Sequence, residues 1–271
     1  MFFRIATWNI NSIRFRFEQV LRYLELCAPD ILCLQETKCL DNLFPREVFL
    51  SAGYKHIALN GQKAYHGVAI LSRLPFVSVE KRFFCQKEEC RYLSVVVKPY
   101  QQAIRIHNFY VPAGGDEPDV QVNEKFRHKL DFLEEMSSIR ADQGDGLSSL
   151  LMGDLNIAPL EDDVWSHKQL LNVVSHTPIE TERLKALCHE GGWVDLMRMK
   201  FPIPIKLYTW WSYRARDWAL ADRGRRLDHI WSSPDLAPFV EDLSIFREAR
   251  GWSKPSDHVP VQSVFNFSRK V

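Results

Sequence analysis

The chain has 271 residues, of which 46% are hydrophobic, and its formal net charge at pH 7 is +1. This length and composition support a sizeable core, and we expect a single domain over residues 1–271. The near-neutral charge excludes attraction to a polyanion through overall basicity, so any such attraction must come from local clusters. The sequence contains neither an 18-residue apolar stretch nor a signal-peptide pattern, which predicts a cytoplasmic protein without a membrane segment. The six cysteines form no C-x-x-C pair, so we expect reduced thiols.

Strand-like apolar runs and two amphipathic helices alternate in the first half. The expected strands are 2–9, 31–34, 67–72, 92–98 and 103–109. The expected helices are 13–27 and about 120–139, the second with Val122, Phe126, Leu130, Leu133 and Met136 on one face. Pro29 ends the first helix, and the continuous run 31–34 is typical of a buried strand.

The second half repeats this style without a linker between the halves. Its expected strands are 147–152, 207–211, 227–231, 242–246 and 259–267, with a helix around 180–189. Many strands with few long helices favour sheets that pack face to face and are covered outside by helices. We therefore predict an α/β fold: a four-layer sandwich with two mostly antiparallel mixed sheets.

Polar residues end or closely follow several of these apolar runs. They are Asn9, Glu36, Asp154, Asn156, Asp228, Asp257 and His258. Strands that end in polar residues bring them to one rim of a sheet, so distant segments can form one site. Carboxylates, amides and a histidine together indicate a metal-assisted hydrolase.

Each of these residues also has a simpler interpretation. Glu36 suits a hard cation such as Mg²⁺, or it is a strand-end acid paired with Lys38. Asn9 and Asn11 point the same way if the strand continues, or they only form a turn.

The later polar residues suit acid–base chemistry at a phosphate. Asp154 can orient or deprotonate a water, and the Asn156 amide can donate to a phosphoryl oxygen. Asp257 and His258 face opposite sides of an extended strand, and Asp228 could hold the histidine in one tautomer. A hydrogen-bonded loop is the alternative for the Asp-His pair.

Residues 206–226 combine basic and aromatic side chains. The basic ones are Lys206, Arg214, Arg216, Arg223, Arg225 and Arg226, and the aromatic ones are Tyr208, Trp210, Trp211, Tyr213 and Trp218. Basic groups suit phosphates and aromatic faces suit bases or sugars. A surface loop with solvated arginines explains the segment equally well.

Seven motifs then occur in a familiar order. They are Trp8-Asn9-Ile10-Asn11, Gln35-Glu36-Thr37-Lys38, Asn108-Phe109-Tyr110-Val111-Pro112, Gly153-Asp154-Leu155-Asn156, Tyr208-Thr209-Trp210-Trp211, Arg226-Leu227-Asp228 and Ser256-Asp257-His258. The sequence thereby resembles the exonuclease III family of DNA-repair nucleases, which includes apurinic/apyrimidinic endonucleases, within the endonuclease/exonuclease/phosphatase fold. The resemblance implies a metal-dependent phosphodiesterase that cleaves 5′ to abasic sites or removes 3′ nucleotides and 3′-blocking groups from duplex DNA. It further implies that the protein is a monomer and does not bind a membrane.

The resemblance also implies roles for individual residues. Glu36 would be the main Mg²⁺ or Mn²⁺ ligand, assisted by Asp257 and Asn11. The surroundings of the metal and phosphate would be completed by Asn9, Asp154, Asn156 and His258. Tyr110 would contact the scissile phosphate, Asp228 would hold His258, and Trp210 and Leu227 would line a sugar pocket. DNA contacts would come from Arg216, Arg223 and Arg225.

Three departures from the family pattern concern the pocket. Asp222 stands where the family often has Asn, and Arg225 stands where it often has a bulky apolar residue. The segment 164–169 also differs, and Trp165 or His167 could narrow the pocket and favour trimming of 3′ ends, unless both are ordinary loop anchors. Two other functions stay open: a same-fold phosphoesterase for a small or lipid phosphodiester, and a non-catalytic nucleic-acid-binding protein.

Overall fold

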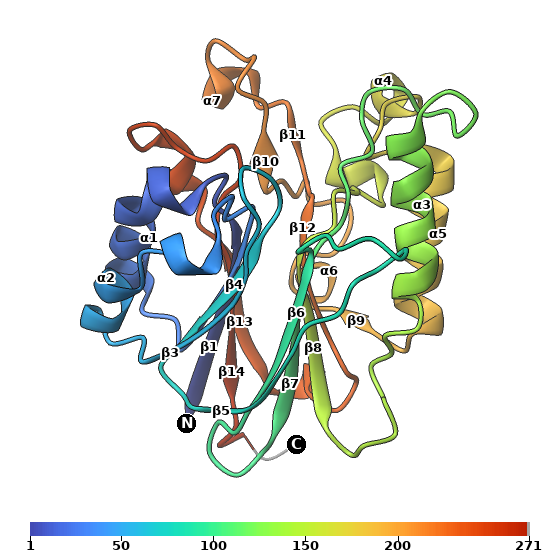
Figure 1. The fold of residues 1–271 in the computed structure, drawn as a ribbon. Coiled ribbons are helices and arrows are strands. Elements are labelled where there is room, and N and C mark those ends of the chain that lie inside the picture. Colours follow the sequence, from blue (N-terminus) through green and yellow to red (C-terminus); the bar gives the residue numbers. More distant parts are fainter. Residues whose placement is uncertain (270–271) are drawn as a thin grey trace.

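The computed structural model describes residues 1–269, and within them two six-stranded sheets pack face to face (Figure 1). The first sheet has the order β13 (Val240–Ile245), β14 (Val261–Asn266), β1 (Phe2–Asn9), β2 (Ile31–Gln35), β4 (Val68–Ser72) and β3 (His56–Asn60). The second has the order β5 (Phe76–Glu80), β6 (Tyr92–Val97), β7 (Ile104–Tyr110), β8 (Ser148–Asp154), β12 (Asp228–Ser232) and β9 (Val194–Asp195). Each sheet is antiparallel except for one central parallel pair, β1 with β2 and β7 with β8.

Helices cover the outer faces of both sheets. The described helices are α1 (Ile13–Cys27), α2 (Arg46–Ser51), α3 (Glu124–Met136), α4 (His167–Leu170), α5 (Pro178–Glu190), α6 (Leu196–Lys200) and α7 (Trp218–Ala221). Figure 1 shows α1 and α2 beside the first sheet and α3 and α5 beside the second. A short ribbon of β10 (Trp210–Trp211) and β11 (Gly224–Arg225) stands above the sheets with α7 at its tip.

Three apolar layers follow from this arrangement. Between the sheets lie inward side chains such as Ile31, Ile106 and Ile230, all fully buried. Because successive strand residues face opposite sides, the alternate residues Leu32 and Leu151 belong to two outer layers that pack against the helices. The predicted four-layer sandwich is therefore confirmed.

Several boundaries differ from the prediction. Helix α3 begins at Glu124, because the Asn123 side chain caps it by accepting from Lys125 N and Phe126 N. Val122 therefore precedes the helix and is exposed, so its place on the apolar face was predicted wrongly. The strands β3 and β5 were missed, and most of β5 is exposed, so it lacks a buried pattern.

The strand register brings the polar ends together. In the second sheet Tyr110 pairs with Asp154, which pairs in turn with Asp228. In the first sheet Asn9 pairs with Gln35, directly before Glu36. The convergence predicted from the strand ends is thus confirmed. No helix among residues 1–269 is long and apolar enough to span a membrane.

Candidate active site

Asp228, His258 and Asp154 form a buried row at the rim, with a hydrogen bond between Asp228 and His258 and a longer ion pair between His258 and Asp154. The distance from His258 Nδ1 to Asp228 Oδ2 is 2.8 Å, and His258 Nε2 lies 3.7 Å from Asp154 Oδ2. The two carboxylates are fully buried and the histidine is 4% exposed. The predicted support of His258 by Asp228 is present in the structure.

The neighbouring charges control the protonation of His258, and burial controls that of Asp154. Burial alone would lower the pKa of His258, but the carboxylates of Asp228 and Asp154 raise it to about 10. The two carboxylates therefore favour a proton on both ring nitrogens, which makes Nε2 a hydrogen-bond donor. Burial raises the pKa of the Asp154 carboxyl, which places that group within reach of general-base chemistry.

A second cluster of oxygen donors adjoins this row. Asn9 Nδ2 donates to Glu36 Oε1 at 2.7 Å and to Asp154 Oδ2 at 2.8 Å, so one amide links the two carboxylates. Asn11 Nδ2 donates to Asp257 Oδ1 at 3.2 Å. Asn11 has a φ of 47° and β1 ends at Asn9 as predicted, so the chain turns here and the turn interpretation of Asn11 applies.

Lys38 shows that the second cluster already holds a cation. Its ammonium lies 2.7 Å from Glu36 Oε2 and 2.6 Å from Asn11 Oδ1. Burial would raise the pKa of the Glu36 carboxyl, but Lys38 and the Asn9 amide hold it below its usual value. A carboxylate and an amide oxygen around a cation are the donor set that suits a hard divalent ion. The ion-pair interpretation and the metal-site interpretation of Glu36 are therefore compatible.

Asp154, Asp228 and His258 could also hold a metal ion by distance, because their ligand atoms lie within 4.8 Å of one another. In that group Nδ1 of His258 is already hydrogen-bonded to Asp228, so Nε2 is the ring atom that remains for a further contact. The oxygen donors around Glu36, with Asp257 across Asn11, fit a divalent ion better. Burial would raise the pKa of Asp257, but the His258 charge and the Trp210 hydrogen bond lower it, so Asp257 stays ionised.

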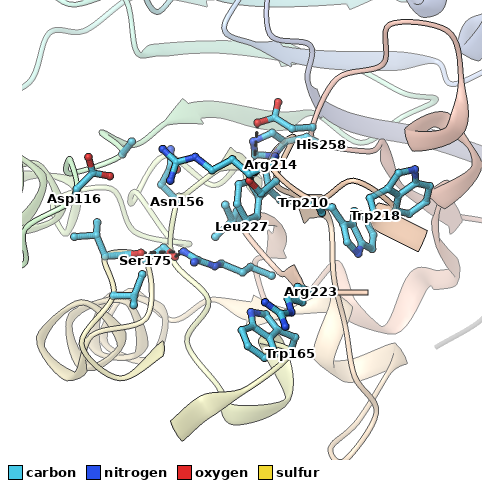
Figure 2. A pocket seen from close by; sticks show the side chains of 18 of the residues that line it. Asp116, Asn156, Trp165, Ser175, Trp210, Arg214, Trp218, Arg223, Leu227 and His258 are labelled. Atoms are coloured by element: carbon cyan, nitrogen blue, oxygen red, sulfur yellow. Dashed lines mark hydrogen bonds between the residues drawn. The ribbon is translucent and has the colours of Figure 1, made fainter. Parts of the chain in front are cut away.

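Both clusters open into one cavity of about 650 Å³. Its lining includes Glu36, Tyr110, Asn156, Asp257 and His258 at the end nearest the two clusters, and Trp165, Trp210, Arg214, Trp218, Arg223, Arg225 and Leu227 elsewhere. Figure 2 shows Leu227 and Trp210 close to His258, and Trp165 beside Arg223. The predicted pocket residues Trp210 and Leu227 thus share the cavity with the candidate catalytic residues Glu36, Asp257 and His258.

The ribbon is attached directly to the catalytic segment. Trp210 bridges to His258 on one side and pairs with Arg225 on the other. Trp210 Nε1 donates to Asp257 Oδ2 at 2.9 Å. Arg225 lies over the Trp210 ring, and Arg223 lies over the Trp165 ring, with 5.2 and 4.7 Å to the ring centroids. The aromatic side chains therefore hold two cations at the cavity wall.

Some predicted residues lie elsewhere. His167 does not line the cavity; its Nδ1 lies 2.8 Å from His176 Nε2, so it acts as a loop anchor, whereas Trp165 does line the cavity. Arg216 is exposed outside the lining. Arg226 is fully buried against Asp163 and Asp195, so this member of the basic segment cannot reach a phosphate.

The sequence also hid several supports of the site. Gln35 Nε2 donates to Asn108 Oδ1 at 2.7 Å and so joins the two sheets below the rim. The buried Lys129 donates to Asn156 O at 2.8 Å and is paired with Glu180. The position of Asn108 near a strand end could have indicated a role at the site. Lys129 lies on an amphipathic helix, where nothing in the sequence distinguishes it from other lysines.

Residues 6–258 match the model of the endonuclease/exonuclease/phosphatase family. The chain belongs to that family. It is 29% identical to exodeoxyribonuclease III of Haemophilus influenzae, over 97% of this chain and 99% of that protein. The predicted resemblance is thus confirmed as membership of the endonuclease/exonuclease/phosphatase family.

Two solved structures of the family have a similar fold. One is the 3′ phosphatase NExo from Neisseria bound to a product DNA hairpin, with a TM-score of 0.89, 29% identity and coverage of 98% of this chain and 100% of that one. The other is an AP endonuclease from Archaeoglobus fulgidus, with a TM-score of 0.88, 32% identity and coverage of 97% and 99%. These similarities agree with the face-to-face sheets described above.

Proposed function

We propose that this protein is a DNA-repair phosphodiesterase that uses Mg²⁺ or Mn²⁺. It cleaves duplex DNA 5′ to abasic sites, or removes 3′ nucleotides and 3′-blocking groups, as a single-domain monomer in a bacterial cytoplasm. Its class as a hydrolytic nuclease follows from the family and from relatives named exodeoxyribonuclease III and AP endonuclease. The observation that carries the proposal is the buried Asp154–His258–Asp228 row, which faces a cavity walled by tryptophans and arginines.

In this proposal Asp154, His258 and Asp228 each have one role in catalysis. Asp154 orients a water and takes its proton as the water attacks phosphorus. His258, protonated at Nε2, donates to a phosphoryl oxygen as negative charge develops there, and Asp228 fixes the ring through Nδ1. Asn156 is held by a hydrogen bond of 2.8 Å from its Nδ2 to Val111 O, which places it beside Asp154 at the cavity wall. Tyr110 lines the cavity beside Glu36 and contacts the same phosphate.

The cation would be held by Glu36, Asp257 and Asn11, with Asn9 as the link to Asp154. When bound, a divalent ion neutralises charge on the phosphate and polarises its oxygen. The Lys38 ammonium lies against two of the same oxygen atoms, so it would shift aside or share them with the ion. The residues themselves keep two carboxylates ionised and oriented next to the water-activating Asp154.

DNA is favoured over a small or lipid phosphodiester by the cavity wall. Trp165, Trp210 and Trp218 offer faces for bases or sugars, while Arg214 and Arg223 supply charge for neighbouring phosphates. A substrate with a single phosphate would leave those cations without a use. The intact row of Asp154, His258 and Asp228 argues against a purely binding function.

A panel of labelled duplexes tests the substrate class. One carries an internal abasic analogue, one a recessed 3′ end, and one a 3′-phosphate, and a phosphodiester of small size serves as the comparison. We expect cleavage of at least one duplex in Mg²⁺ or Mn²⁺, and loss of that cleavage in EDTA. Turnover of the small phosphodiester alone would refute DNA as the substrate, and full activity in EDTA would refute the metal.

Glu36→Ala tests the metal position. It should abolish the rise in unfolding temperature that Mg²⁺ or Mn²⁺ produces, and it should strongly lower kcat, because the main ligand is gone. Folding should be retained, since a rim carboxylate contributes little packing. Glu47→Ala, at an exposed glutamate in the first turn of α2, is the matched control and should keep the metal response. An unchanged metal response in Glu36→Ala would move the metal to another site.

A further inference from the structure

Arg225 and Arg226 are adjacent in the chain but differ in how their charges are balanced. The Arg226 guanidinium is fully buried and ion-paired, with Nη1 2.7 Å from Asp195 Oδ2 and Nη2 2.9 Å from Asp163 Oδ2. Arg225 lines the main cavity, and within residues 1–269 it forms no ion pair with a carboxylate. Arg225 is only partly exposed, and the carboxylate that acts on its charge, Glu180, is already ion-paired with Lys129. A partly desolvated cation without a carboxylate of its own suggests an anion that arrives with a ligand.

Among the described residues, the hydrogen bonds of Arg225 leave one edge of its guanidinium without a partner. Nη1 donates to Val174 O at 3.1 Å and to Ser175 Oγ at 2.7 Å. Among the described residues, Nε has no hydrogen-bond partner, although it is shielded from solvent, and no bond leaves from Nη2. The Nε and Nη2 protons point the same way and together form the edge that binds a carboxylate or phosphate through two parallel bonds.

The acceptors that hold Arg225 are themselves fixed. Ser175 adopts a φ of 88°, an unusual value for a residue with a side chain. The Glu180 carboxylate accepts from Ser175 N at 3.0 Å, and the buried Lys129 is paired with Glu180. The same Lys129 donates to Asn156 O, so the wall that carries Arg225 is tied to the catalytic segment. Arg225 is therefore oriented before substrate binds, which lowers the entropy cost of a specific contact.

The position of Arg225 relative to His258 shows which part of a substrate it meets. Across the ribbon the order is His258, Trp210, Arg225. Neighbouring strands lie about 5 Å apart, so the backbones of Arg225 and His258 are separated by roughly 10 Å across the two pairings. At this distance Arg225 lies too far from His258 to contact the reacting phosphorus itself. It can reach a group attached to that phosphate, such as a fragment that blocks the 3′ end.

We propose that Arg225 is a specificity-determining residue that selects 3′-blocking fragments with a negative charge, in particular a carboxylate, over a neutral abasic sugar. The inference rests on the proposed function and names the substrate class of the same site. A glycolate left on a 3′ end by sugar oxidation has the required chemistry. Water adds to phosphorus, the bond from phosphorus to the 3′ oxygen breaks, and that oxygen takes a proton. The glycolate leaves as phosphoglycolate, and the carboxylate stays on the open edge of Arg225 throughout.

Two matched 3′ ends test this selection. One duplex carries a 3′-phosphoglycolate, and the other carries a 3′-phosphohydroxyethyl end of nearly the same size without the charge. The measured quantity is the ratio of kcat/KM on the two ends at one ionic strength. For the wild-type protein we expect a ratio of about 10 to 100 in favour of the glycolate, the range for a charge-assisted contact.

Arg225→Gln should bring this ratio to about one, because the amide keeps much of the side-chain length but has no charge. Arg225→Lys keeps the charge without the planar edge and should give an intermediate ratio. Arg223→Gln is the matched control on the same ribbon and should lower both rates by one factor, which leaves the ratio unchanged. A circular dichroism melt of each variant checks folding, and the ratio is insensitive to a loss that affects both ends alike.

The outcomes separate the two proposals. A wild-type ratio near one, or a ratio that survives Arg225→Gln, overturns the role of Arg225 while the nuclease assignment stands. Cleavage of neither 3′ end and of no abasic duplex overturns the proposed function itself. A high wild-type ratio that disappears in Arg225→Gln and persists in Arg223→Gln supports the inference.

Discussion

The rim of the sheets and the ribbon above it are built in different ways. At the rim, Asp154 and Asp228 are fully buried strand residues that pair with each other in register. On the ribbon, residues 212–223 are mostly exposed, and Leu220 in α7 is 85% exposed. The rim is held by long backbone ladders, whereas the ribbon combines a two-residue ladder with side-chain contacts, such as the hydrogen bond from Trp211 Nε1 to Asp222 Oδ1 and the position of Arg247 over the Trp211 ring.

This difference assigns two kinds of work to the two regions. Catalytic groups need fixed distances, and strand ends over a packed core supply them. Groups that recognise a substrate can sit on a ribbon whose aromatic faces and arginines meet DNA from outside. Arg225 lies where the regions join, since its strand neighbour Trp210 also bridges to His258.

The largest expected effect tests the rim as one unit. His258→Asn should lower kcat by about 100-fold or more while KM changes little, because its bond is strongest at the transition state. Asp228→Asn should also be severe, since an amide cannot balance the histidine's charge or fix its tautomer. Single-turnover kinetics on the preferred duplex would measure both.

The double variant decides whether the two residues act together. His258→Asn with Asp228→Asn should be barely worse than His258→Asn alone, because Asp228 acts through the ring. Losses that multiply would show that Asp228 works independently of His258. Glu47→Ala again provides a rate that should stay at the wild-type level.

The rim and the ribbon differ in how much of their structure could be predicted from the sequence. The strand ends at Asn9, Glu36, Asp154 and Asp228 were predictable because an apolar run followed by an acid or amide fixes both a strand and its edge. The sequence left the turn at Asn11 open as one of two alternatives, because its contacts with Asp257 and Lys38 come from other segments of the chain.

The ribbon was harder to interpret from residue type alone. Arg225 and Arg226 look equivalent in the sequence, yet only Arg226 meets Asp163 and Asp195, which come from distant segments. Two-residue strands such as β10 and β11 and the four-residue helix α7 are too short to give a periodic pattern.

The dependence of activity on pH tests the protonation states of His258 and Asp154 at the rim. His258 is protonated up to its raised pKa of about 10, so wild-type activity should persist until the pH approaches that value. Asp154 must lose its proton, and burial raises its pKa, so the acid limb should lie above the usual range of an aspartate. In Asp228→Asn the largest charge that raises the histidine pKa is removed while burial still lowers it.

The alkaline limb of Asp228→Asn should therefore move to lower pH. The measurement is kcat against pH in saturating metal, with Glu47→Ala for reference. An alkaline limb that stays in place would show that the Asp228 charge does not control the protonation of His258.

The smallest effect concerns the ribbon and its salt dependence. Removing one cation that binds a phosphate should lower the slope of log affinity against log salt by about one unit on duplex DNA. Arg223, at the cavity wall, should show this when replaced by Ala, and the exposed Arg216 should add a second unit if DNA extends along the ribbon. Arg46→Ala, at an exposed position on α2 beside the first sheet, should leave the slope unchanged. Because the rim keeps its geometry without these arginines, kcat at saturating DNA should fall far less than affinity. A slope that is unchanged in the double variant would mean that the arginines of the ribbon are solvated surface groups, and that the rim alone holds the substrate.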